Sequence, residues 1–377
     1  MRIKTMSFET FGPLQNGTIR FHDGFNILTG INGTGKSSVL EAVYELCKHD
    51  PQIQMGQLLQ RLKEGSISAE FDIQSLSPHT QWHMTFKYVK ASNSWLFESQ
   101  NEFLKKISPN NNIIVTEAHQ LKERLSKLRL QMNHMFPPNE TISLISAHRG
   151  EIQNQSLVPL SPETWRSKRT NERFAGLQTL MRLINDKTGN LERTIDKIHR
   201  KFFSTQNKNL VTVQKLYTNK SFLATQLETF ENEYELAQAA SGVLETLFIV
   251  AETATLKNSI ILIDEPELHL HPKAQAMMFN YLWHLTTAEG GSNQVIIATH
   301  SLSMIYLQTK GKVMNFRHDT GGVKVETIIE DGNAQDALKY ALADLGYDEA
   351  TFKAAFKFAA SAKIESNIFN HDKWGVG

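Results

Sequence analysis

Apolar and polar residues follow two different periods along this chain. Over residues 1–29 and 66–99 they alternate in the manner of half-buried β-strands. Segment 25–29 and the aliphatic run 260–263 are apolar at most positions, which is typical of strands buried on both faces of a parallel sheet. Helical spacing follows the first of these runs, at residues 38–46. The pattern therefore predicts an α/β protein with an antiparallel β subdomain near its N-terminus.

The second half of the chain alternates between strands and helices. We expect strands at 259–263 and 294–298, a helix near 272–288, and a final pair of strands within 312–329. Residues 162–240, by contrast, have helical spacing and few β-branched runs. We therefore divide the chain into an N-terminal lobe (1–150), a basic helical insertion that forms a lid or arm (151–240), a C-terminal lobe (241–330) and a helical tail (331–377).

Residues Gly30–Ser37, with the sequence GINGTGKS, match the phosphate-loop pattern G-x-x-x-x-G-K-[ST] at every fixed position. The loop lies between a predicted strand and a predicted helix, which is the context that this motif requires. Its glycines let backbone N–H groups point at a phosphate, and the helix N-terminus adds partial positive charge. We expect Lys36 to reach the β- and γ-phosphates and the Ser37 hydroxyl to be a ligand of Mg²⁺. The motif predicts a nucleoside triphosphate site formed by Asn32, Gly33, Thr34, Gly35, Lys36, Ser37 and Ser38.

Two carboxylates, Asp264 and Glu265, end the aliphatic run 260–263. At the carboxyl end of a central parallel strand, Asp264 would lie beside the phosphate loop and hold Mg²⁺ through water, and Glu265 would polarise the attacking water. Both could instead cap the following helix, since Pro266 suits a first helical turn, but the phosphate loop favours the catalytic interpretation. His300 follows the next strand, at the edge where open α/β sheets bind ligands. We expect it to contact the γ-phosphate.

These features resemble the ABC-type ATPase heads, a group that includes the RecF and SMC proteins. The continuation Asp264–Pro272, DEPELHLHP, is similar to the OLD-type branch, which includes the ATPase subunits of the Septu (also found beside some retrons) and PARIS anti-phage systems. Ile145–Arg149 resembles another segment of that branch. The resemblance implies an ABC-type P-loop head that binds ATP and Mg²⁺ and hydrolyses ATP, with Glu265, His300 and Lys36 as its catalytic residues.

In such ATPases two heads enclose the nucleotides, and a Ser-Gly signature of one head contacts the γ-phosphate held by the other. Ser241 and Gly242 stand at the corresponding distance before Asp264, although their neighbours depart from the L-S-G-G-Q form. Ser241 is equally suited to be the N-cap of the apolar helix that follows. The two roles are compatible, because a helix N-terminus favours a phosphate. The glutamine of the Q-loop stays open between Gln54 and Gln57.

Charge and composition limit the classes of partner. The formal net charge of +1 provides no global case for nucleic acid or a membrane. Locally, Arg166–Lys220 contains thirteen basic and four acidic residues, which indicates either a solvated face or a surface for DNA, RNA or an acidic partner. His269 and His271 stand two residues apart, a spacing that favours a structural or dimer-contact role over a metal site. The single cysteine, Cys47, excludes an internal disulfide.

Two functions are compatible with these observations. The first is an ATPase that dimerises on ATP and regulates a separately encoded effector, a nuclease, in anti-phage defence; the second is a RecF-like DNA-repair ATPase that binds DNA. A transporter subunit is disfavoured by the altered signature and the long insertion. Ile328–Gly332 weakly resembles the opening of a TOPRIM nuclease, but no D-x-D strand follows it. Because neither a signal peptide nor an apolar stretch of about eighteen residues is present, we expect a cytoplasmic protein.

Overall fold

A computed structural model describes the part of the chain that holds the predicted site. The described residues are 2–47, 61, 66–74, 81–89, 91, 94–99, 112–115, 142–145, 147, 210–217, 220–227, 230–235, 241–254, 256–301, 304–305, 311–330 and 350. No helix among them is long and apolar enough to cross a membrane.

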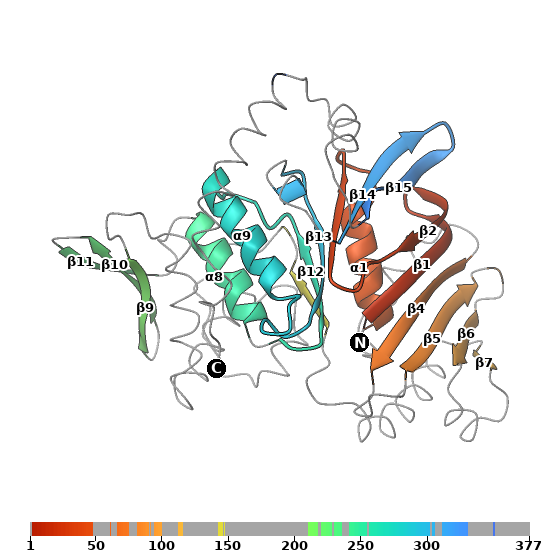
Figure 1. The fold of residues 1–377 in the computed structure, drawn as a ribbon, viewed down its shortest axis with the longest axis horizontal. Coiled ribbons are helices and arrows are strands. Elements are labelled where there is room, and N and C mark those ends of the chain that lie inside the picture. The colour runs from red at the N-terminus through yellow and green to blue at the C-terminus, as the bar shows by residue number, and fades with distance from the viewer. Residues whose placement is uncertain are drawn as a thin grey trace.

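One twelve-stranded sheet organises the structure (Figure 1). Its order is β7-β6-β5-β4-β1-β2-β15-β14-β3-β13-β12-β8. The strands are β1 (Arg2–Phe11), β2 (Leu14–Arg20), β3 (Phe25–Gly30), β4 (Ser66–Gln74), β5 (Gln81–Val89), β6 (Ser94–Ser99), β7 (Asn112–Val115), β8 (Ile142–Ile145), β12 (Ile260–Asp264), β13 (Gln294–Ala298), β14 (Lys312–Asp319) and β15 (Gly322–Glu330). Strands β14, β3, β13, β12 and β8 run parallel, whereas β7 to β2 are antiparallel. The predicted α/β class and antiparallel subdomain are confirmed.

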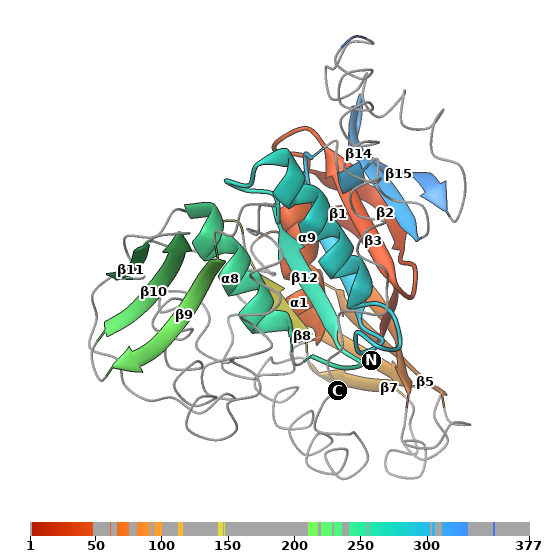
Figure 2. The same ribbon diagram turned by 60° about the vertical axis from the view of Figure 1, so that its left-hand side comes forward.

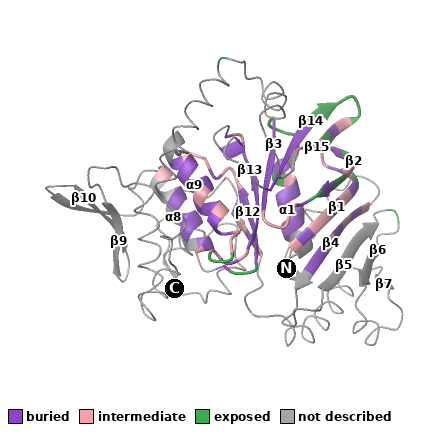
Figure 3. Cartoon of the chain, viewed as in Figure 1, coloured by how far each residue is buried: buried purple, intermediate pink, exposed green. Residues whose placement is uncertain are grey.

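The parallel half of the sheet carries helices on both faces (Figure 2). Helix α1 (Lys36–Cys47) lies on one face, and α8 (Ser241–Thr253) and α9 (Pro272–His284) lie side by side on the other. Buried residues concentrate in these helices and in the strands between them (Figure 3). Because strand side chains alternate between the two faces, each central strand contributes to two hydrophobic layers.

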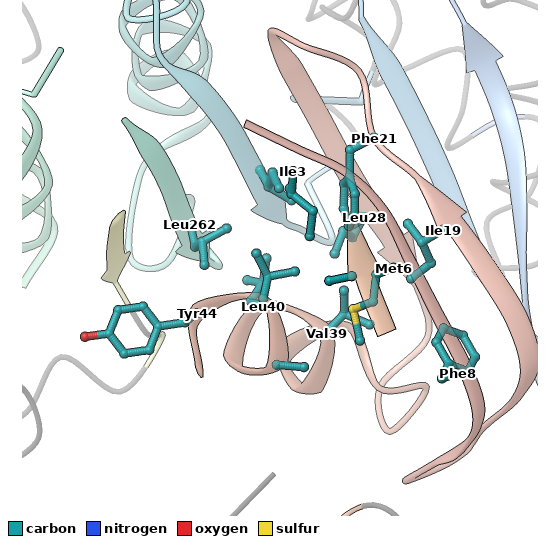
Figure 4. Close-up of a cluster of buried hydrophobic side chains, with 14 of the residues drawn as sticks. Ile3, Met6, Phe8, Ile19, Phe21, Leu28, Val39, Leu40, Tyr44 and Leu262 are labelled. Atoms are coloured by element: carbon teal, nitrogen blue, oxygen red, sulfur yellow. The ribbon is translucent and has the colours of Figure 1, made fainter. Parts of the chain in front are cut away.

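The layer beneath α1 is made by every second residue of the central strands. Leu28 and Leu262 pack there with Val39 and Leu40 of the helix (Figure 4). All four are at most 1% exposed, and burial of each such side chain contributes about 2 kcal/mol. This layer anchors the helix that follows the phosphate loop.

The opposite layer is held by aromatic residues. The ring of Phe25 in β3 lies 5.2 Å from that of Phe279 and 5.8 Å from that of Trp283, both in α9. The hydroxyls of Thr253 in α8 and Tyr281 in α9 share a hydrogen bond of 2.8 Å. The two helices therefore pack on the sheet as one unit.

Residues 210–235 differ from the sequence prediction. They form a separate antiparallel sheet of β9 (Leu210–Tyr217), β10 (Lys220–Leu227) and β11 (Phe230–Glu235) instead of part of a helical insertion. Their alternating apolar residues, such as Val211, Val213 and Phe222, match a strand period that the prediction overlooked. Residues 151–209 and nearly all of the tail 331–377 lie outside the described part, so the boundaries of the four predicted parts stay a prediction.

Candidate active site

The phosphate loop connects the carboxyl end of β3 to the first residue of α1. Three of its glycines have positive φ: Gly30 at 137°, Gly33 at 80° and Gly35 at 93°. At Gly30 an added Cβ would lie 2.3 Å from the carbonyl oxygen of Phe316 in β14, so glycine is also required by the close packing of the two strands. The glycines of the motif thus fix the path of the loop as predicted.

Lys36 is folded over the loop that precedes it. Its Nζ donates hydrogen bonds to the carbonyl oxygens of Gly30, at 2.8 Å, and Ile31, at 2.9 Å. The residue is 6% exposed. Burial lowers the pKa of Lys36 to about 8, although the nearby carboxylates of Asp264 and Glu265 oppose the shift. The ammonium is therefore a weakly hydrated cation held at the position where the motif requires one.

The remaining loop residues present an accessible surface. Asn32, Gly33 and Ser37 are exposed and Ser38 is half-buried, while Thr34 is buried. The Thr34 hydroxyl donates to the Ile31 carbonyl oxygen at 2.8 Å, which stiffens the turn. Backbone N–H groups of this turn and of the start of α1 are the donors that a phosphate would meet.

Asp264, at the carboxyl end of β12, meets the start of α1. The Ser37 hydroxyl donates a hydrogen bond to its carboxylate. Burial raises the pKa of Asp264, and the Ser37 hydrogen bond and the Lys36 charge partly offset that effect. A hydroxyl and a carboxylate oxygen suit a hard cation such as Mg²⁺. Among the described residues no group of three or more His, Cys, Asp or Glu could hold a metal, so phosphate oxygens and water would have to complete this site.

Glu265 lies beside His300. Its Oε1 is 3.9 Å from Nε2 of His300, and each side chain is about one third exposed. Glu265 has a φ of 47°, which is uncommon for a residue with a Cβ, and its N–H donates to the Ala298 carbonyl oxygen at 2.8 Å. Burial first and the Lys36 charge second lower the pKa of His300, while Glu265 raises it. The imidazole is therefore held neutral at pH 7.

Glu267 is a site residue that the sequence analysis did not assign. Its Oε1 accepts hydrogen bonds from the Thr299 hydroxyl at 2.6 Å and from the backbone N–H groups of His300 at 2.8 Å and Ser301 at 3.1 Å. The segment after β12 is thereby tied to the segment after β13. The Asp-Glu-Pro-Glu spacing was the available signal, since it places a third carboxylate three residues beyond the strand end.

Ser241 and Gly242 begin α8. Ser241 is exposed and Gly242 is half-buried. An added Cβ at Gly242 would lie 2.7 Å from the carbonyl oxygen of His269, so this helix start packs tightly against the segment that follows Glu267. Nδ1 of His269 lies 4.0 Å from Oε1 of Glu245 in the same helix. The structure thus places the predicted signature beside His269 and Leu270 of its own chain.

Several predicted residues cannot be placed. Gln54, Gln57, Arg149 and most of Arg166–Lys220 lie outside the described residues, as does the side chain of Cys47. Within the described part, the carboxyl ends of β3, β12 and β13 bring together Lys36, Ser37, Asp264, Glu265 and His300. A buried cation, an oxygen pair that suits a metal and a carboxylate able to orient a water molecule are groups that phosphoryl transfer to water uses.

Comparison with known proteins identifies the family. A family model described as AAA ATPase domain (AAA_15) matches residues 1–305. Septu protein PtuA of Bacillus thuringiensis is 21% identical over 337 residues, which is 80% of this chain and 72% of the relative.

Two solved SMC head structures share the fold. The SMC head bound to the C-winged helix domain of ScpA aligns with a TM-score of 0.56 and 12% identity, over 87% of this chain and 97% of that one. An Smc head with an extended coiled coil, bound to the C-terminal domain of ScpA derived from Pyrococcus furiosus, aligns with a TM-score of 0.54 and 10% identity, over 92% and 99%. The family model covers most of the chain, so the chain belongs to the AAA ATPase domain family and is an ATPase, with the fold of an SMC head and a similarity to Septu protein PtuA.

Proposed function

We propose that this chain is an ATP-driven switch that closes into a head-to-head dimer and regulates a separately encoded effector, a nuclease, in anti-phage defence. The observation that carries the proposal is the convergence of Lys36, Ser37, Asp264, Glu265 and His300 at one edge of the sheet, with an exposed Ser241 at the start of α8.

Each residue has a distinct role in ATP hydrolysis. The ammonium of Lys36 and the N–H groups of residues 32–38 would bind the phosphates, and Ser37 and Asp264 would hold Mg²⁺, which neutralises phosphate charge when bound. Glu265 orients the attacking water and accepts its proton. The neutral imidazole of His300 offers a hydrogen bond to the γ-phosphate, so its position depends on whether that phosphate is present.

Dimer formation is supported by the exposure of Ser241. A helix N-terminus that begins with an exposed hydroxyl and a glycine can donate to a phosphate that another copy holds. An N-cap role within the chain uses the same residue. Residues 267–270 lie against this helix start, so the second copy would contact one compact surface.

A separate effector in defence is supported by the similarity to Septu protein PtuA. An SMC head, which shares this fold, is described as bound to the C-winged helix domain of ScpA, which shows that such a head can bind another protein. Co-expression with the product of the adjacent open reading frame, followed by a pull-down with and without ATP, tests for the effector. Failure to recover a complex in either state would contradict this part of the proposal.

A second candidate, a RecF-like repair ATPase, is favoured by the basic excess of Arg166–Lys220. If this segment contacts DNA phosphates, the logarithm of the binding constant will fall linearly with the logarithm of the salt concentration. Each phosphate contact should add about one unit to the steepness of that line. A flat dependence would exclude DNA as a ligand of this segment.

The Glu265→Gln variant tests the switch. We expect it to lower kcat by about 100-fold or more and to give a larger dimer fraction with ATP and Mg²⁺ than without, as measured by light scattering after size exclusion. Because the amide keeps the shape of the side chain but is not a base, ATP binding should persist. Wild-type turnover together with an unchanged mass would refute the switch.

A matched variant separates dimerisation from binding. Adding Ser241→Arg to Glu265→Gln should abolish the ATP-dependent dimer. It should leave the ATP affinity of the monomer unchanged, measured at a protein concentration too low for dimers to form, because Ser241 would act only on the nucleotide of the other copy. Loss of affinity in the monomer would instead show that Ser241 acts within its own chain.

A further inference from the structure

Glu267, which is half-buried, connects two loops of the site by hydrogen bonds. A single oxygen, Oε1, accepts three hydrogen bonds, from the Thr299 hydroxyl and from the N–H groups of His300 and Ser301. These three residues directly follow β13. The carboxylate therefore fixes the backbone that carries the imidazole of His300.

The other carboxylate oxygen has a different environment. Oε2 is buried and has no hydrogen-bond partner in the described part of the chain. All of the connection is thus made by Oε1. A glutamine at this position can keep the three accepted bonds through its carbonyl oxygen. An alanine removes the acceptor of the His300 N–H and of the Thr299 hydroxyl, whereas the Ser301 N–H keeps a second acceptor, the Thr299 hydroxyl oxygen at 2.9 Å.

A second path runs from the same backbone toward the start of α8. The Ser301 hydroxyl donates to Oε1 of Gln275 at 2.8 Å, and Nε2 of Gln275 donates to the Leu270 carbonyl oxygen at 2.9 Å. Leu270 follows His269, against whose carbonyl oxygen Gly242 packs. Residues 267–270 therefore connect His300 to the helix start that carries Ser241.

We propose that Glu267 is a positioning residue that holds His300 against the γ-phosphate and, through residues 268–270, couples the position of His300 to Ser241. This inference rests on the proposed role of His300. It explains why this carboxylate directs one oxygen to the backbone of His300 while its other oxygen is buried without a partner among the described residues. A displaced γ-phosphate would move His300 and Glu267 together, and with them the surface offered to the second copy.

The test is a double-mutant cycle on kcat for ATP hydrolysis, with Glu267→Ala, His300→Ala and the double variant. We expect Glu267→Ala alone to lower kcat by about 10- to 100-fold, because a misplacement near 1 Å has effects of this size, and to leave the KM for ATP unchanged. In the His300→Ala background the same substitution should change kcat by less than about twofold. Glu267→Gln should stay within about threefold of the wild type, since its carbonyl oxygen replaces Oε1.

The outcomes distinguish failure of the positioning role of Glu267 from failure of the proposed role of His300. If His300→Ala lowers kcat and Glu267→Ala lowers it further by its full single-variant factor, Glu267 does not act through His300 and the positioning role fails, while the proposed function stands. If His300→Ala leaves kcat unchanged, the role of His300 fails first and the inference falls with it. Tyr281→Phe is the control for destabilisation, because it removes a buried hydrogen bond to Thr253 away from the site; it should lower the melting temperature and leave kcat unchanged.

Discussion

The Ser37 hydroxyl donates a hydrogen bond to the Asp264 carboxylate, and so joins the first turn of α1 to the end of β12. The two residues are more than two hundred positions apart in the sequence. Helix α1 packs on β12, the strand that carries Asp264, through Leu40 and Leu262. This packing holds the Ser37 hydroxyl and the Asp264 carboxylate close together before any ligand binds. A preformed pair of this kind lowers the cost of ordering the site when a cation arrives.

Asp264→Asn should weaken the dependence on Mg²⁺ without preventing folding. The amide can still accept from Ser37, but it lacks the charge that attracts the cation. We expect the Mg²⁺ concentration for half-maximal ATPase activity to rise by about 10- to 100-fold, the range for residues that support a metal through water. Asp23→Asn is the matched control, because Asp23 pairs with Lys4 before β3, at the other end of that strand from the phosphate loop. Equal Mg²⁺ midpoints for the two variants would contradict this role of Asp264.

The lowered pKa of Lys36 predicts a pH-dependent affinity for nucleotide. Without nucleotide, Lys36 is charged below its pKa of about 8 and loses its proton above that value. Bound phosphates favour the charged form and raise the pKa again, so binding above pH 8 must take up a proton. The Kd for a non-hydrolysable ATP analogue should therefore rise by up to about tenfold for each pH unit above 8.

Calorimetry in two buffers of different ionisation enthalpy measures this proton uptake directly. Uptake should approach one proton per nucleotide near pH 9 and vanish near pH 6.5. Lys36→Arg is the control, because a guanidinium stays charged throughout this range; its affinity should be lower and independent of pH. A wild-type protein that takes up no proton at pH 9 would show that Lys36 is not the titrating group.

The convergence of Lys36, Ser37, Asp264, Glu265 and His300 at one edge of the sheet was largely predictable, because the sequence signals for these residues are local. Three elements can each be recognised from a stretch of about ten residues. They are the phosphate loop, the aliphatic strand before Asp264 and the strand before His300. In a parallel sheet the carboxyl ends of these strands then meet at one edge, independent of the length or structure of the segments that connect them. Glu267 was missed because its role depends on a hydrogen bond to a loop more than thirty residues later, and no local period reports such a contact.

The three strands at 210–235 were missed for another reason. Lys215 and Lys220 lie in a region whose basic charge and helical spacing extend from residue 162, and the strand period within it covers only short segments of the sequence. Strand pairing is also decided by partners distant from any one window, so β propensity depends strongly on context. The antiparallel strands at 66–74 and 81–89, which have clearer alternation, were predicted correctly.

Gly30 and Gly33 provide a matched test of the loop geometry. Both have positive φ, but an added Cβ at Gly30 would lie 2.3 Å from the Phe316 carbonyl oxygen, whereas one at Gly33 would meet nothing within 4 Å. Gly33→Ala should therefore lose only about 1 kcal/mol, the cost of a left-handed conformation. Gly30→Ala must also separate β3 from β14 and should cost about 2–4 kcal/mol. Thermal melting without nucleotide measures the difference. Equal falls in melting temperature would mean that the close approach of Gly30 to Phe316 does not constrain the loop.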